Sequence, residues 1–68
     1  MRRQDFLKLE VGNRVNFKNE EWDRGTVTDV CNVGGKRNVT VCWDVKPKGE
    51  DSVSVFYSSA WIDRLEVN

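Results

Sequence analysis

The sequence predicts an all-β protein, a five-stranded barrel with a short helical turn before the last strand. The first observation is the stretch Asn38–Asp44, in which Val39, Val41 and Trp43 alternate with polar residues, as in a half-buried strand. The second is that four more short runs of this kind follow along the chain, separated by turn residues. Because Trp43 is the largest apolar group that so short a chain can bury, we expect the core to form around it.

The first ten residues mix charged with apolar side chains. They are predicted to form an N-terminal arm, partly flexible, ahead of a barrel that spans residues 11–68. Terminal segments fray unless their apolar residues pack against the rest of the fold. We therefore expect Leu9 or Val11 to dock on the barrel and residues 1–5 to be loose.

The first strand of the barrel is predicted over residues 14–18. Val15 and Phe17 alternate there with polar residues and are expected to point inward. The next segment, Asn19–Arg24, is polar and charged around a single tryptophan, which predicts a loop. In that loop, Trp22 would either cover one end of the barrel or stand out as a binding surface.

The second strand is predicted to begin at Gly25. Val27 and Val30 are three residues apart, so strict alternation fails, and a β-bulge near residues 28–29 would bring both inside while bending the strand. The pair Gly34-Gly35 predicts a hairpin turn, because both residues tolerate positive φ. The strand that carries Trp43 follows this turn.

The fourth strand is predicted over residues 52–57, with Tyr57 on one face and Phe56 on the other. Residues 58–61 are then expected to form a short helical turn that is capped by a serine. The last apolar residues, Leu65 and Val67, are expected to pair beside the first strand.

Size and composition limit what can stabilise this fold. The chain has 68 residues and lies just below the roughly 70–80 at which one core suffices. It has two cysteines and no histidine, whereas structural zinc sites need four Cys or His ligands. The predicted hairpin sets Cys31 opposite Asn38, about four residues from Cys42, which favours two reduced thiols over a disulfide. Homo-oligomerisation stays open as a source of stability.

Charge and hydropathy limit where the protein can be located and which partners it can bind. Lys and Arg number 11, as do Asp and Glu, so the net charge is about zero, which argues against strong non-specific binding to nucleic acid. No signal peptide is recognisable, and no apolar run approaches the roughly 20 residues of a membrane span. We therefore expect a cytoplasmic protein that does not associate with membranes.

Four stretches carry a resemblance to a known superfamily. They are Val11-Gly12-Asn13-Arg14-Val15, Gly25-Thr26-Val27, Val39–Asp44 and Asp63-Arg64-Leu65. Together they resemble the skeleton of SH3-like modules, a group that includes Tudor, KOW and Mind-bomb-type domains. The resemblance covers nearly the whole chain and implies an SH3-like barrel. Such modules mostly recognise peptides, methylated residues or nucleic acids.

A second set of residues, Arg14-Val15, Trp22, Gly25, Tyr57 and Ile62-Asp63-Arg64-Leu65, carries a weaker resemblance. It is similar to the pattern of the type II dihydrofolate reductases, which are short SH3-like chains that assemble as tetramers. That family lines its active pore with a Val-Gln-Ile-Tyr stretch. The matching stretch here is Ser54-Val55-Phe56-Tyr57, which keeps the tyrosine and lacks the glutamine. This resemblance implies an oligomeric type II dihydrofolate reductase-like enzyme as an alternative function.

The residues themselves favour a binding module over an enzyme. No histidine is present to act as a general base near neutral pH, and neither cysteine has a histidine partner. We therefore expect no catalysis, no metal and no cofactor. Aromatic residues gather instead in the loop before the second strand, at the end of the fourth strand and in the turn after it. The predicted site for a protein or peptide comprises Trp22, Asp23, Phe56, Tyr57 and Trp61.

Two other interpretations of these aromatic residues remain open. They could plug the ends of the barrel, or they could form a cage for a methylated ammonium group beside a carboxylate such as Asp23 or Asp44. The basic residues supply a further alternative, a nucleic-acid site. Its candidates are Lys36 and Arg37 on the hairpin with Lys46 and Lys48 on the next loop, which could be neighbours in space and bind phosphates. Glu50 and Asp51 lie beside the second pair, as in an ordinary mixed surface.

Overall fold

The structure is a computed structural model that describes residues 1–18 and 20–67, with only the backbone described for residues 20–22. Two short helices accompany five strands. In chain order the elements are α1 (Arg3–Leu7), β1 (Arg14–Phe17), β2 (Glu20–Val33), β3 (Lys36–Trp43), β4 (Ser54–Tyr57), the 3₁₀ helix η1 (Ser59–Arg64) and β5 (Leu65–Val67).

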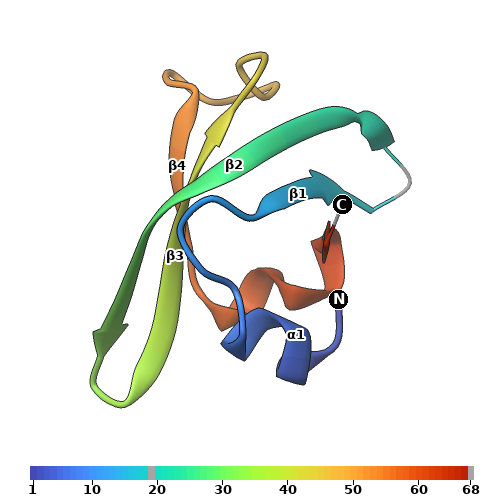
Figure 1. The fold of residues 1–68 in the computed structure, drawn as a ribbon. Coiled ribbons are helices and arrows are strands. Elements are labelled where there is room, and N and C mark those ends of the chain that lie inside the picture. Colours follow the sequence, from blue (N-terminus) through green and yellow to red (C-terminus); the bar gives the residue numbers. More distant parts are fainter. Residues whose placement is uncertain (19, 68) are drawn as a thin grey trace.

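The strands form one antiparallel sheet in the order β4-β3-β2-β1-β5. Figure 1 shows β2 as a long curved strand, which pairs with β3 along one part of its length and with β1 along the other. The helices α1 and η1 pack against each other beside the sheet. The predicted fold class is confirmed: the protein is mostly β, with a short 3₁₀ helix before the last strand.

The bend in β2 follows from the predicted bulge. The register between β2 and β3 shifts between Val27 and Asp29, so that Val27 is fully buried and Val30 packs against the core although they are three residues apart. The bulge also increases the local twist, which lets one strand serve both parts of the sheet. One boundary was wrong, because Gly25 does not open the strand. It lies inside β2, between Val15 and Trp43.

The loop predicted over residues 19–24 was also wrong for residues 20–24, because β2 already begins at Glu20. Asn19 lies outside the described residues. Glu20 pairs with Phe17, and Arg24 pairs with Asn16. The polar composition suggested a loop, but an antiparallel neighbour satisfies the backbone groups of a strand whatever its side chains are. The register shifts between these two pairs, and Asp23 lies within the irregularity.

The β2–β3 hairpin agrees with its prediction. Gly34 and Gly35 both have positive φ, at 59° and 76°, and they join Val33 to Lys36. Cys31 pairs with Asn38, as expected, and Cys31 and Cys42 are free thiols.

The core forms around Trp43, which is 2% exposed. Its ring stacks on Phe17 with the centroids 4.2 Å apart. The predicted inward residues of β3 are therefore confirmed. Among the side chains that the structure describes, the buried apolar residues are Phe6, Leu9, Val15, Val27, Val39, Val41, Trp43, Tyr57 and Leu65.

The first ten residues contribute Phe6 and Leu9 to this core. Leu9 docks, which is one of the two expected possibilities, whereas Val11 is exposed. Residues 1–5 were expected to be loose, and that stays a prediction; in the structure α1 begins at Arg3 and the Met1 ammonium group donates a hydrogen bond to the Ile62 carbonyl oxygen at 3.0 Å. The contribution of Phe6 to the core was not predicted.

The C-terminal prediction is confirmed. The Ser58 hydroxyl caps η1 by accepting a hydrogen bond from the Ala60 N–H at 3.3 Å. Strand β5 then pairs with β1, with Leu65 beside Phe17 and Val67 beside Val15. The helix η1 lies next to the end of β4 because it begins only two residues after that strand ends, and the groove described next is found there.

Candidate functional site

A groove of about 370 Å³ opens where η1 meets the loop between β3 and β4. The end of β1 and the irregular part of β2 complete its wall. Its lining residues are Phe17, Asp23, Pro47, Lys48, Glu50, Tyr57, Trp61 and Arg64. Aromatic side chains and both signs of charge therefore meet at one surface, and the volume lies in the range of known ligand sites.

Tyr57 forms the inner part of the groove and is 2% exposed. Its hydroxyl oxygen accepts a hydrogen bond from the Trp43 indole N–H at 2.9 Å, inside the core. The rings of Tyr57 and Trp43 meet edge to face, with centroids 6.1 Å apart. Tyr57 is thus a rigid core residue that also lines the groove.

Trp61 forms the outer aromatic wall and is 37% exposed. Its ring packs edge to face on Tyr57 with centroids 5.2 Å apart. The Arg64 guanidinium lies over the Trp61 ring, 5.5 Å from the centroid, a cation–π geometry. Trp61 is therefore held from two sides while more than a third of it stays available to a ligand.

The groove brings together some of the predicted site residues. Asp23, Tyr57 and Trp61 all line it. Phe56 does not, because neighbouring residues of a strand point to opposite faces; it is 58% exposed, on the other side of β4 from buried Tyr57. The side chain of Trp22 lies outside the described residues.

Sequence reasoning placed Lys48 only in the nucleic-acid alternative. It missed four lining residues, namely Phe17, Pro47, Glu50 and Arg64. Phe17 carried the pattern of a core residue, and it contributes to both the core and the groove. Pro47 is the only proline of the chain, and a rigid residue in a loop beside aromatic side chains was a usable signal. The place of Arg64 in the groove could not be predicted, because it depends on how η1 sets the guanidinium over the Trp61 ring.

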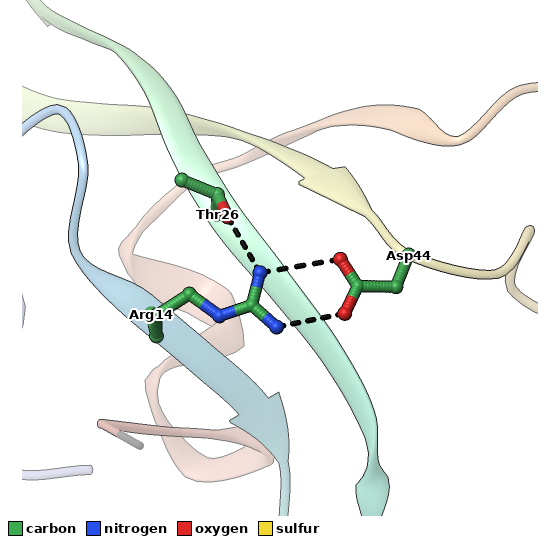
Figure 2. Close-up of polar contacts among 3 residues, drawn as sticks. All are labelled: Arg14, Thr26 and Asp44. Atoms are coloured by element: carbon green, nitrogen blue, oxygen red, sulfur yellow. Dashed lines mark hydrogen bonds and ion pairs between the residues drawn. The ribbon is translucent and has the colours of Figure 1, made fainter.

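Asp44, proposed as a cage carboxylate, is engaged elsewhere. Figure 2 shows its two oxygens facing the Arg14 guanidinium: Arg14 Nη2 donates to Oδ2 at 2.7 Å and Nη1 to Oδ1 at 3.2 Å. Arg14 Nη1 also donates to the Thr26 hydroxyl at 2.7 Å. These hydrogen bonds lower the pKa of Asp44 below its ordinary value. The pair links β1, β2 and the end of β3.

The four basic residues proposed for nucleic acid do not form one surface. Lys36 opens β3, whereas Lys46 lies beyond its last residue, Trp43. An eight-residue strand is about 26 Å long at roughly 3.3 Å per residue. The pair Lys36 and Arg37 therefore lies far from Lys46 and Lys48, and of the four only Lys48 lines the groove.

Two further findings concern metal binding and membrane-spanning helices. Among the described residues, no three Cys, Asp or Glu side chains come together in a way that could hold a metal ion. Within the same part of the chain, neither helix is long and apolar enough to span a membrane.

The free energy of unfolding is expected to fall in alkaline solution because of Tyr57. Burial raises the pKa of its hydroxyl, the hydrogen bond from Trp43 lowers it and the charge of Glu50 raises it, with a net increase. The phenol of the unfolded chain titrates near pH 10. The folded state thus holds the proton more tightly, so this stabilisation is complete below about pH 10 and is lost as the pH rises through the folded-state pKa.

Urea unfolding of the wild type and of Tyr57→Phe, at several pH values from about 8 to 11, measures this effect. The stability of the wild type should fall relative to that of the variant as the pH rises, while the lysines titrate equally in both proteins. A difference that stays constant over this range would contradict the burial of the hydroxyl.

Comparisons with known proteins return no relative: no protein-family model, no curated protein and no solved structure matches the chain. The function therefore has to be inferred from the groove and its residues.

Proposed function

We propose that the protein is a non-catalytic binding module with an SH3-like fold, and that it recognises a protein or peptide through the groove beside η1. The strand order and the 3₁₀ helix before the last strand support the SH3-like assignment. The observation that carries the function is the partly exposed Trp61 packed on the buried ring of Tyr57. Trp, Tyr and Arg are the residues on which binding energy at protein interfaces concentrates.

The groove suggests what such a peptide carries. Trp61 and Pro47 offer apolar surface for an apolar side chain, and the rigid support of Trp61 lowers the entropy lost on binding. Asp23 and Glu50 supply negative charge, while Lys48 and Arg64 supply positive charge at the same groove. A peptide with an apolar residue flanked by charges of both signs matches these walls.

The geometry gives less support to the other two functions. A nucleic-acid site needs a continuous basic track, and the four cations considered for it lie toward opposite ends of β3. Of the stretch that lines the reductase pore only Tyr57 is cleanly kept, and its hydroxyl is bound to Trp43 inside the core. The free thiols of Cys31 and Cys42 agree with the reducing cytosol, which we keep as the proposed compartment.

Substitution of Trp61 tests this proposal. Peptides are first selected from a random library displayed on phage, and their affinities are then measured by isothermal titration calorimetry. Trp61→Ala is expected to weaken binding roughly 30-fold, as for a hot-spot residue worth about 2 kcal/mol.

Phe56→Ala serves as the matched control, since it removes an exposed aromatic ring from the opposite face of β4. It should leave the affinity unchanged. If both variants fold and the Phe56 variant loses binding while the Trp61 variant keeps it, the ligand occupies the other face of the sheet. A folded Trp61 variant with full affinity would overturn the groove as the site.

A further inference from the structure

A second pocket, of about 220 Å³, lies apart from the groove, between α1, the β2–β3 hairpin and η1. Its lining residues are Arg3, Phe6, Leu7, Gly35, Lys36, Arg37, Ser59 and Ile62. Three of them are cations and none is a carboxylate. In a chain whose charges balance, this is a local excess of positive charge in a concave site.

No carboxylate among the described residues pairs with the charges of this pocket. The ion pairs among the described residues are Arg2 with Asp5 and Arg14 with Asp44, so neither Arg3 nor Lys36 has a carboxylate partner there. Both side chains belong to exposed residues and come from segments far apart in the sequence. Like charges repel when they are brought together, and an anion between them would relieve that repulsion.

Arg37 holds the third charge in a fixed position. Its Nη2 donates a hydrogen bond to the Leu9 carbonyl oxygen, which ties β3 to the segment that follows α1. Its Nε is buried and has no hydrogen-bond acceptor among the described residues. The guanidinium is thus anchored by one bond, and no carboxylate of the described residues pairs with it, so it adds positive charge to the pocket that it lines.

We propose that this cationic pocket binds a phosphate monoester carried on a small apolar molecule. A phosphate monoester bears nearly two negative charges at neutral pH and several acceptor oxygens, which suits two free cations and one anchored guanidinium better than a carboxylate does. The Ser59 hydroxyl lies at the same site, and Leu7 and Ile62 supply apolar wall for the rest of the ligand. The pocket is too small, and too far from Lys46 and Lys48, to follow a nucleic-acid backbone.

The test is a titration of the ¹⁵N-labelled full chain with phenyl phosphate at constant ionic strength, followed by amide chemical shifts. Saturable shifts are expected at Arg3, Gly35, Lys36 and Ser59. The double variant Arg3→Gln/Lys36→Gln should bind phenyl phosphate about tenfold more weakly or worse. Both positions are exposed, so the variant should fold, and Lys36→Gln alone should shift the affinity in the same direction.

The double variant Lys46→Gln/Lys48→Gln is the matched control, because it removes the same charge beyond the other end of β3. Its affinity for phenyl phosphate should equal that of the wild type. Benzoate, which carries a carboxylate on the same ring, should bind more weakly than phenyl phosphate. Shifts that do not saturate, or equal weakening in both double variants, would overturn the pocket as a site, and equal affinity for benzoate would overturn the choice of phosphate.

Discussion

Replacing Trp43 with alanine is expected to unfold the protein. The indole is 2% exposed, stacks on Phe17 and donates a hydrogen bond to the Tyr57 hydroxyl. Removing a buried tryptophan costs about 3–5 kcal/mol, and the Tyr57 hydroxyl would also lose its buried donor, at about 1–3 kcal/mol. A domain of 68 residues is stable by roughly 3–10 kcal/mol in all. The loss is therefore comparable to the whole stability.

Far-UV circular dichroism and urea unfolding measure this outcome. Trp61→Ala is the control, since it removes the same side chain from a position that is 37% exposed and should cost only about 1 kcal/mol. Trp43→Phe separates the two contributions at position 43, because it keeps an aromatic ring beside Phe17 but removes the donor to Tyr57. A Trp43→Ala protein that unfolded cooperatively within about 1 kcal/mol of the wild type would show that the core is not organised around this indole.

The buried face of this core could be predicted because strand alternation is a local property. Each residue of a strand points to the side opposite its neighbours, so the pattern around Val39 and Val41 gave their burial without knowledge of any partner strand. The bulge in β2 was predictable for the same reason, since the spacing of Val27 and Val30 breaks the alternation at one place. The paired glycines similarly determined the β2–β3 turn, and with it the partner of Cys31.

The extent of β2 could not be predicted, because it depends on pairing and not on side-chain pattern. Glu20 belongs to the strand because its backbone pairs with Phe17. The burial of Phe6 had the same kind of origin. A five-residue helix has too few turns to show a period, and Phe6 is buried because α1 packs beside η1.

Two aromatic residues of the candidate groove could be predicted from the sequence, whereas the approach of its charged residues could not. Tyr57 lies at the end of β4 and Trp61 in the turn after it, two segments that can meet at one edge of the predicted barrel. Asp23 and Lys48 line the same groove only because β2 is bent and the β3–β4 loop lies on the same side of the fold as Trp61. Long-range geometry also separates Lys36 from Lys48, because the length of β3 lies between them. The sequence alone did not exclude that these two lysines are neighbours.

Alanine at position 25 is expected to destabilise the fold, and the reason lies in this long-range geometry. Gly25 lies where β2 passes between β1 and β3, beside Val15 and Trp43. A Cβ atom there would lie 2.5 Å from Val41 Cγ1 and 2.9 Å from Trp43 Cε3. Both neighbours are buried core atoms that cannot turn away into solvent. Glycine is required here for close approach within the strand, which explains why it does not mark the start of β2.

Two opposing effects decide the magnitude for Gly25→Ala. Alanine restricts the unfolded chain and on that account stabilises by about 0.4–1 kcal/mol. Overpacking of a filled core costs about 1–3 kcal/mol and sometimes more, and here two side chains must move. We therefore expect a net destabilisation of roughly 1–2 kcal/mol, measured by urea unfolding.

The double variant Gly25→Ala/Val41→Ala tests the cause. Val41→Ala alone leaves a cavity and destabilises the wild type, but when it is combined with Gly25→Ala it removes the closest clashing atom. The cost of Val41→Ala should thus be smaller in the Gly25→Ala background than in the wild type, by at least about 0.5 kcal/mol in a double-mutant cycle. Strictly additive effects would mean that the new Cβ does not press on Val41. The packing of β2 against β3 would then be looser than the structure, with Val41 and Trp43 buried beside Gly25, shows.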